Sequence, residues 1–213
     1  MTDLTAIRDS RIGGLEELRE VTGQPAEMVI RKDIGRLEEV SANFIANSPF
    51  VLVATSAASG RCDVSPRGDP AGFVRVLDEH TLAIPERPGN RRADTLINII
   101  ENPHIGLIFL IPGVEDTLRV NGRASVVREP ALLESMAHQG KAPSLAILVD
   151  VEECFLHCAK AFRRSGLWDV DPLRERAVPT SGAMFREMMG LQAVCTAEQV
   201  DADLEKSIQT TLY

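Results

Sequence analysis

The sequence predicts a mainly β protein with added helices (α+β), in which an antiparallel sheet closes into a barrel. Six or seven strand-length segments follow one another between residues 50 and 155. A single amphipathic helix interrupts them in mid-sheet, and this order favours an antiparallel barrel over a sandwich or a parallel sheet. No glycine-rich turn leads from a strand into a helix, which excludes Rossmann and P-loop folds.

Residues 1–47 are predicted to form a helical extension. Apolar side chains recur at near-helical spacing over residues 12–21 and again over residues 34–44. The run Gly23-Gln24-Pro25 separates the two segments, since glycine and proline end helices.

From Phe50 onward the apolar period changes to that of strands. The predicted strands are residues 50–55, 62–67, 73–77, 81–85, 105–111, 118–126 and 145–155. The inserted helix follows the loop 88–90, carries one apolar stripe and ends at Asn102-Pro103. Further helices are expected at residues 130–138 and 197–212. The predicted divisions are therefore the extension 1–47, the barrel 48–169 and a helical tail 170–213, in one structural domain.

Charge and hydropathy exclude several classes of protein. The net charge of −8 gives no support for general nucleic-acid binding or for a polybasic membrane patch. The apolar run Ile105–Ile111 has the length of a strand and is far short of a membrane span. No signal peptide is visible after Met1, so a cytoplasmic location is expected. The four cysteines form no Cys-x-x-Cys pair, and we expect neither a metal site nor a disulfide.

Basic residues gather where the inserted helix begins. Arg87, Arg91 and Arg92 lie at or just before its first turn, an unfavourable place for cations because a helix N-terminus carries partial positive charge. A bound phosphate would resolve the conflict through backbone N–H groups and guanidinium contacts. The alternative is that these arginines are solvated or pair with Glu86 and Asp94. On the second strand, Arg67 shares a face with Ser65, and Gly68 would let a flat ligand approach the backbone.

Several runs together resemble the pyridoxamine 5'-phosphate oxidase-like family of FMN-binding split barrels, and in particular its branch of uncharacterised FMN-dependent enzymes. They are Ser65–Phe73, Pro88–Asp94, Asn102-Pro103, Thr117–Gly122, His157–Ala161 and Arg164–Trp168. The resemblance covers about residues 48–169. It implies a split β-barrel homodimer that holds flavin mononucleotide (FMN) at the subunit interface.

The resemblance also implies that Arg67 and the Arg91/Arg92 pair hold the phosphate, and together with the arguments from the residues above it gives a set of predicted cofactor-binding residues. They are Ser65, Arg67, Gly68, Arg87, Asn90, Arg91, Arg92, Lys160 and Trp168. The true oxidases carry an Arg-Lys pair about one turn later, so which arginine takes the phosphate stays open. The basic segment around Lys160 and Trp168 is expected near the flavin, across the dimer interface; the alternative is a capped helix with a buried tryptophan.

Three functions are compatible with these features. The first is an FMN-dependent oxidoreductase acting on a small molecule, in which the flavin transfers electrons. The second is a flavin-binding carrier or sensor without turnover. The third is a split barrel for haem or a deazaflavin, with His157 as the candidate haem ligand. Pyridoxamine phosphate oxidase activity is not expected, because the C-terminal substrate-binding signature of the true oxidases is not evident. The sequence indicates neither the substrate nor a catalytic residue.

Overall fold

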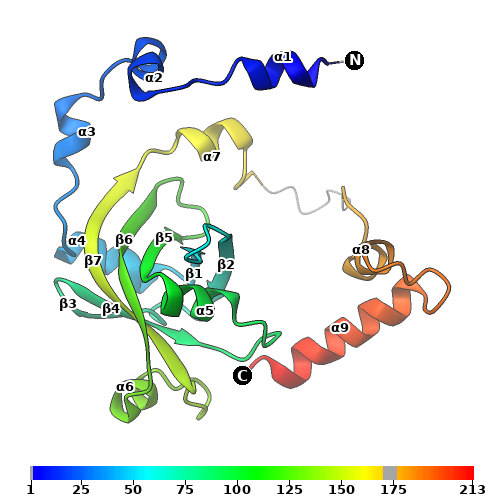
Figure 1. The fold of residues 1–213 in the computed structure, drawn as a ribbon. Helices are drawn as coiled ribbons and strands as arrows, with labels where there is room; N and C mark the ends of the chain where they lie inside the picture. The colour runs from blue at the N-terminus through cyan, green and yellow to red at the C-terminus, as the bar shows by residue number, and fades with distance from the viewer. Residues whose placement is uncertain (1, 170–176) are drawn as a thin grey trace. The chain divides into compact units, whose positions relative to one another are not determined.

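The computed structural model describes residues 2–169 and 177–213, and they divide between two compact units (Figure 1). The first unit, Met1–Ile34, contains three short helices. They are α1 (Leu4–Asp9), α2 (Leu15–Thr22) and α3 (Glu27–Arg31), and none of them buries a residue. The helical prediction for this segment is confirmed, although in shorter pieces than the apolar spacing indicates.

The second unit, Gly35–Tyr213, contains a seven-stranded antiparallel sheet that curls into a split barrel (Figure 1). Its strands are β1 (Phe50–Ser56), β2 (Cys62–Gly68), β3 (Arg75–Asp78), β4 (Thr81–Glu86), β5 (His104–Leu110), β6 (Thr117–Val127) and β7 (Leu145–His157). Their order across the sheet is β2-β1-β5-β6-β7-β4-β3. The predicted fold class is confirmed, and every predicted strand has a counterpart within a few residues.

Alternate residues of the strands fill the barrel interior. Val51 and Val53 of β1, and Leu107 and Phe109 of β5, have no exposed surface. Their neighbours on the same strands are half-buried on the outer face, as the period of two along a strand requires. The apolar spacing thus places one continuous core inside the sheet.

The longest strand pair, β6 with β7, bends at a bulge next to Gly122. A Cβ atom at Gly122 would collide with the backbone oxygen of Asp150. Only glycine therefore allows the two backbones to approach so closely at this bend, as is common where a strand curves to close a barrel.

The barrel is split between β2 and β4, which stand first and sixth in the strand order. Among the described residues no backbone ladder joins them, and side chains bridge the gap. Arg67 at the end of β2 contacts Glu86 at the end of β4, with 3.1 Å between Nε and Oε2. Just beyond the strand ends, Arg87 Nε lies 2.6 Å from Asp69 Oδ2. Ion pairs therefore bridge the ends of β2 and β4 across the split.

The second unit also contains helices. They are α4 (Glu39–Asn47), α5 (Asp94–Glu101), α6 (Pro130–Ser135), α7 (Lys160–Ser165), α8 (Ser181–Met188) and α9 (Ala197–Thr211). Helix α5, predicted as the mid-sheet insertion, packs on β1, β2 and β6, and α4 packs on β3 and β6. The compact unit thus begins before α4, at Gly35, whereas the sequence division was placed after residue 47.

The described part of the tail forms a helical pair. Gly182 of α8 lies against α9, where its N–H donates to Asp201 Oδ1 at 2.6 Å. The predicted final helix is confirmed as α9, whereas residues 170–176, where the predicted tail begins, lie outside the described residues. In the described ranges, the helices are all too short or too polar to span a bilayer.

Candidate functional site

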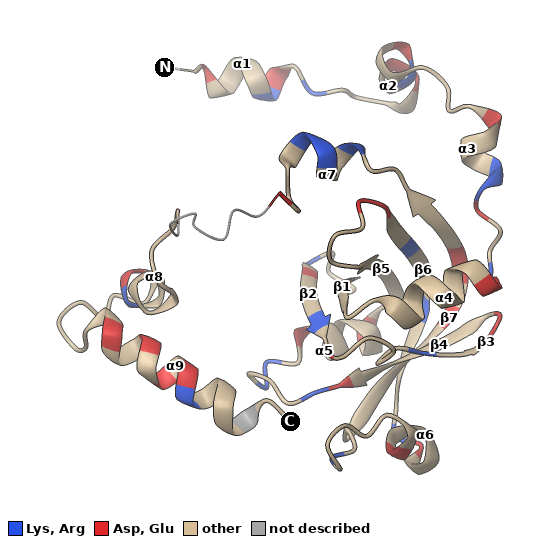
Figure 2. Cartoon of the chain, turned by 180° about the vertical axis from the view of Figure 1, so that it is seen from behind, with Lys and Arg blue, Asp and Glu red and all other residues tan. Residues whose placement is uncertain are grey.

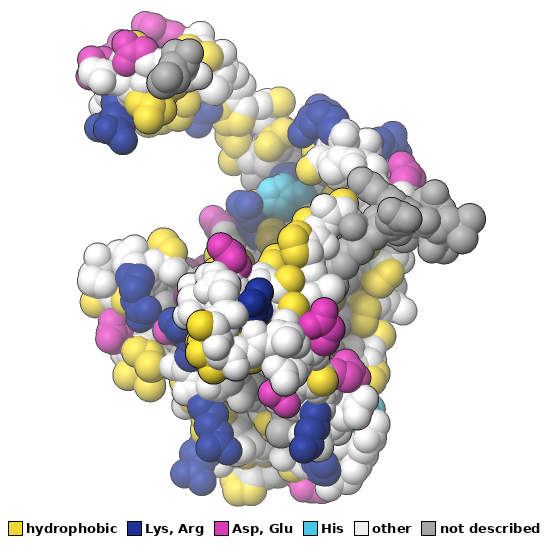
Figure 3. Space-filling view, turned by 90° about the vertical axis from the view of Figure 1, so that its right-hand side faces the viewer, with side chains coloured by type: hydrophobic (Ala, Val, Ile, Leu, Met, Phe, Trp, Pro, Cys, Tyr) yellow, Lys and Arg dark blue, Asp and Glu magenta, His cyan; other side chains and the backbone are white. Residues whose placement is uncertain are grey.

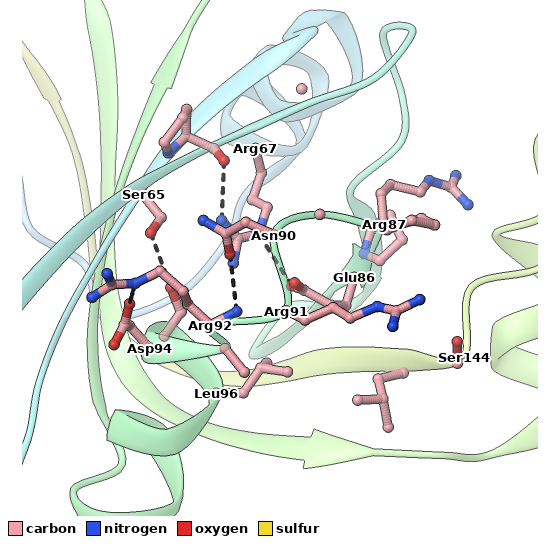
Figure 4. Close-up of a pocket in the computed structure, with 18 of the residues that line it drawn as sticks. Ser65, Arg67, Glu86, Arg87, Asn90, Arg91, Arg92, Asp94, Leu96 and Ser144 are labelled. Atoms are coloured by element: carbon pink, nitrogen blue, oxygen red, sulfur yellow. Dashed lines mark hydrogen bonds and ion pairs between the residues drawn. The ribbon is translucent and has the colours of Figure 1, made fainter. Parts of the chain in front are cut away.

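A cavity of about 630 Å³ opens at the split of the barrel. Its walls come from the end of β2, the loop between β4 and α5, the first turn of α5, the start of β7 and the last two residues of the chain (Figure 4). The volume falls within the range of about 300–1,000 Å³ typical of small-molecule sites.

The cavity gathers most of the residues predicted to bind a cofactor. They are Ser65, Arg67, Gly68, Arg87, Asn90, Arg91 and Arg92. Segments that are about twenty residues apart in the sequence, on β2 and before α5, thus meet at one site. Lys160 and Trp168 do not line the cavity.

The loop before α5 has an unusual backbone. Arg91 and Ala93 adopt left-handed conformations, with φ of 59° and 56°, and Ala93 is the N-cap residue of α5. The side chain of Asn90 supports the loop, since its Oδ1 accepts from the N–H of Arg92 at 3.0 Å. Ala93 has no side-chain acceptor, and in the part of the chain that the structure describes no side-chain cap bonds the first turn of α5. The N–H groups of that turn therefore remain available to an anion.

Three of the four arginines around the cavity are paired with carboxylates. Arg67 contacts Glu86, and its Nη1 also donates to the backbone oxygen of Pro66 at 3.0 Å. Arg87 contacts Asp69 and donates from Nη2 to the oxygen of Met136 at 2.9 Å. These two guanidinium groups hold neighbouring segments together. The alternative from the sequence paired Glu86 with one of the arginines before α5, whereas in the structure Glu86 pairs with Arg67.

Arg92 pairs with Asp94 at 2.8 Å in the first turn of α5. The hydrogen bond from Arg92 lowers the pKa of Asp94 below its ordinary value, and the same bond raises the pKa of Arg92. The pair therefore stays ionised throughout the neutral range. Arg92 is 71% exposed, so its bond to Asp94 is accessible to solvent.

Arg91 differs from the other arginines of the cavity. Among the described residues, its guanidinium makes no hydrogen bond and no ion pair. The side chain is exposed, lines the cavity and extends toward the side where Ser144 lies (Figure 4). Arg91 is therefore the cation of this site that remains available to a ligand.

A small polar cluster lies at the base of the site. The hydroxyl of Ser65 donates to Asp63 Oδ2 at 2.9 Å, and that of Thr95 donates to the same atom at 2.7 Å. Thr95 Oγ1 also lies 3.2 Å from Ser65 Oγ, so Ser65 helps to hold β2 against α5, a structural role in addition to the predicted cofactor contact. Asp63 and Thr95 were not predicted, although Asp63 shares the inward face of β2 with Ser65.

Sequence reasoning also missed Asp69 and Tyr213. Asp69 follows β2 directly, within the run Ser65–Phe73. Its side chain is only 1% exposed, which the sequence does not indicate. Tyr213 lies far away in the sequence, yet its hydroxyl donates to Asp69 Oδ1 at 2.8 Å. No local pattern signals a contact across 144 positions.

The segment with Lys160 and Trp168 forms a separate feature. Trp168 stacks on Phe162, with ring centroids 5.4 Å apart, and its Nε1 donates to the backbone oxygen of Val114 at 2.9 Å. Lys160 is the first residue of α7. Both are exposed or half-buried within one chain, and their placement near a flavin across a dimer interface stays a prediction.

Comparison with known proteins identifies the barrel. The family model for pyridoxamine 5'-phosphate oxidase matches residues 37–158, which is more than half of the chain. The match includes β2, the loop before α5 and the start of β7, and therefore most of the cavity wall. Tyr213 lies outside it. No curated protein matches the chain.

Several solved structures resemble the chain. HupZ of Group A Streptococcus is 23% identical, with 56% of this chain and 93% of that chain covered and a TM-score of 0.46. An FMN-binding protein from Syntrophomonas wolfei is 14% identical, with 73% and 97% covered and a TM-score of 0.44. The haem storage protein HutZ from Vibrio cholerae is 18% identical, with 57% and 94% covered and a TM-score of 0.41.

Proposed function

Because the chain belongs to the pyridoxamine 5'-phosphate oxidase family, we propose that it binds FMN in the cavity at the barrel split and acts as an oxidoreductase on a small molecule. The observation that carries this proposal is the position of Arg91, an unpaired cation beside an uncapped helix N-terminus in a cavity of about 630 Å³. The bound flavin would supply the electron transfer, and the residues of the chain would bind and orient it.

The phosphate of FMN fits the polar end of the cavity. An anion at the first turn of α5 would accept from backbone N–H groups and from Arg91, and bonds to ionised groups are stronger than neutral ones. Left-handed residues such as Arg91 and Ala93 also occur in the backbone nests that bind anions in other proteins. Arg67, Arg87 and Arg92 would then act mainly by holding the loops in place.

The remaining wall suits a flat ring. Phe73, Leu96 and Leu145 give it apolar surface. Gly68 lies on the same wall, and a Cβ there would meet only Phe50 and Pro49 at 3.5 Å, an ordinary contact distance. Packing therefore does not require glycine at this position, whereas close approach of a ligand to the backbone does.

A second copy of the chain is the proposed partner. Apolar side chains on the outer face of the barrel, including Leu52, Ile108 and Leu110, are only half-buried, and Leu156 at the end of β7 is 51% exposed. A homodimer would cover this face and could bring α7 of the partner toward the flavin. A cytoplasmic location is proposed with it.

Haem is the alternative ligand that the geometry favours less. His157, the candidate axial ligand, ends β7 and packs its ring against Phe155 at 5.4 Å. It does not line the cavity, so a haem ligated by His157 would have to bind elsewhere. A flavin carrier without turnover would use the same cavity as an enzyme, and only kinetics separates the two.

The test begins with the purified chain after removal of any bound ligand. FMN, riboflavin and haem are titrated separately, with flavin fluorescence or the haem Soret band as the signal. We expect FMN to bind more tightly than riboflavin, because only FMN has the phosphate. Equal affinities, or binding of haem alone, would contradict the proposal. Anaerobic reduction of the bound FMN by NADH or NADPH, followed by a screen of acceptors, then separates an enzyme from a carrier.

A further inference from the structure

The last two residues of the chain form part of the cavity wall. Leu212 and Tyr213 follow α9 and line the same cavity as Arg91. In Figure 1 the end of the chain lies beside the loop between β4 and α5. A helix that begins at Ala197 therefore ends at the mouth of the proposed cofactor site.

Tyr213 is held there by contacts with three different loops of the barrel. Its hydroxyl donates at 2.8 Å to Oδ1 of Asp69, a residue of the loop between β2 and β3. Its ring centroid lies 5.7 Å from Cζ of Arg87, between β4 and α5. Between α6 and β7, its ring packs on His138 at 4.6 Å, and its backbone oxygen accepts from Lys141 Nζ at 2.8 Å.

The acceptor of the Tyr213 hydroxyl is a buried carboxylate. Asp69 has 1% of its side chain exposed, with Oδ2 accepting from Arg87 and Oδ1 from Tyr213. If Tyr213 left, Oδ1 would lose a donor in a place that water reaches poorly, which is unfavourable. The bond therefore selects one docked position for the end of α9.

We propose that Tyr213 is a latch that holds α9 and Leu212 across the cavity mouth, so that FMN enters and leaves only when the bond between Tyr213 and Asp69 opens. The proposal rests on FMN binding in this cavity, but the latch itself can be observed without FMN. Tyr213 acts here as a positioning residue, and it need not touch the flavin.

A latch and a ligand-contacting wall predict different kinetics. Opening of a latch precedes both entry and exit, so a weaker latch speeds association and dissociation by the same factor. Loss of a direct contact with the ligand would instead speed dissociation and weaken affinity, with association little changed.

The first experiment detects the latch without FMN. Tyr213 is the single tyrosine of the chain, so the ultraviolet absorbance of phenolate reports on it alone. The hydrogen bond to Asp69 raises the pKa of Tyr213, and Asp69→Asn should bring the titration back toward that of free tyrosine. Asp203→Asn, an exposed carboxylate on α9, is the matched control. An ordinary titration in the parent chain would overturn the latch, whether or not FMN binds.

The second experiment measures FMN exchange by stopped-flow fluorescence. Tyr213→Phe keeps the ring and removes only the hydroxyl. We expect association and dissociation to become about tenfold faster, the change for loss of one bond to a charged group. The equilibrium affinity should stay within about twofold, since both rates change together. Asp203→Asn should exchange FMN like the parent.

Each other outcome has a definite meaning. Unchanged rates in Tyr213→Phe would overturn the latch, and so would a weaker affinity with unchanged association, because Tyr213 would then contact the ligand directly. Thermal unfolding of each variant shows that the fold is retained. If the parent chain does not bind FMN, the proposed function fails, and the tyrosine titration still decides whether the latch exists.

Discussion

Arg91 and Arg92 are neighbours in the sequence, but within residues 2–169 and 177–213 only the guanidinium of Arg92 has a partner. Its Nε lies 2.8 Å from Asp94 Oδ2, whereas Arg91 lines the cavity (Figure 4). The difference follows from the backbone. Arg91 has a left-handed conformation with φ of 59°, which directs its side chain away from the one that follows. Two residues that look equivalent in the sequence therefore have different roles in the site.

The first prediction separates these two arginines by FMN affinity. Arg91→Ala should weaken FMN binding by about ten- to a hundredfold, the loss of one charge-assisted bond of about 1.5–3 kcal/mol. Arg92→Ala should have a smaller effect, because Arg92 already pairs with Asp94. Riboflavin, which lacks the phosphate, should bind both variants and the parent alike. If riboflavin affinity falls in parallel with FMN affinity in Arg91→Ala, Arg91 does not bind the phosphate.

The second prediction concerns stability without ligand. Arg87 and Asp69 have only 15% and 1% of their side chains exposed, so Arg87→Ala leaves a buried carboxylate without its cation and should lower the free energy of unfolding by about 3 kcal/mol. Arg92→Ala removes an exposed, solvent-screened pair and should change the free energy of unfolding much less than Arg87→Ala does. Urea denaturation of the apoprotein measures both. Similar values for the two variants would show that Arg87 has no special structural role.

The third prediction is that the chain forms a homodimer that buries more than about 2,000 Å² in total, as stable obligate dimers do. The half-buried apolar residues on the outer faces of β1 and β5 are the surface expected to be covered. Light scattering at micromolar concentration measures the mass, and a monomer would contradict the prediction. Ile108→Glu should dissociate the dimer, whereas Val40→Glu, at a residue of α4 that is 76% exposed, should not.

The fourth prediction follows from the raised pKa of Tyr213. A group whose pKa is raised by folding stabilises the folded arrangement fully below its ordinary value, about 10 for tyrosine, and loses that effect as the pH rises through the raised value. The phenolate would then face the Asp69 carboxylate, which repels it, with the Arg87 guanidinium offsetting part of the repulsion. Lys141 and His138 are the other titratable side chains that contact Tyr213. FMN exchange should therefore be constant from about pH 7 to 9 and accelerate above about pH 10.

Tyr213→Phe is the control for this pH profile. It cannot ionise, so its exchange should already be fast and should not change with pH over the same range. Circular dichroism at each pH shows whether the barrel stays folded. If the FMN exchange rates of the parent chain and of Tyr213→Phe change with pH in the same way, ionisation of Tyr213 is not the cause.

The fifth prediction tests the bend of the barrel. Gly122→Ala places a Cβ against the backbone oxygen of Asp150 and should lower the free energy of unfolding by about 1–3 kcal/mol, because two backbones must move apart. Gly89→Ala is the control, since no atom lies within 4 Å of a Cβ there. Thermal unfolding of the two apoproteins compares them. Equal stability would show that the bend is more adaptable than its close contact indicates.

The strands and helices of the barrel could be predicted from the sequence because the patterns that define them lie within short segments. Alternation of buried and exposed residues defines strands such as β1 and β5, and the apolar stripe of α5 defines the inserted helix. Periodicity alone does not predict that Arg67 lies beside the residues before α5. The resemblance to a family predicts it, and the cavity wall contains both. The pair of Arg92 with Asp94 is one of the alternatives that the sequence leaves open. The pair of Arg67 with Glu86 was not predicted, because spacing alone does not decide which guanidinium a carboxylate meets.

The rest of the site depends on distant contacts that leave no local pattern. Tyr213 reaches Asp69 only because α8 and α9 form a pair whose far end returns to the barrel, and nothing near residue 213 indicates that return. Arg92 pairs with Asp94 and Arg91 does not contact that carboxylate, and this difference accompanies the left-handed backbone of Arg91. Such features are set by the folded geometry of a loop and not by the types of residue in it.

Because the ion pair between Arg67 and Glu86 bridges the split, the distance between β2 and β4 is set by side chains. A backbone ladder would fix the spacing of two strands at about 4.8 Å, whereas a side-chain bridge depends on the length of the residues that form it. Residues of a different length at these two positions would change the distance between β2 and β4 without breaking a backbone hydrogen bond of the sheet. The width of the site can therefore be changed at these two positions without altering core residues such as Val53 and Leu107, which have no exposed surface.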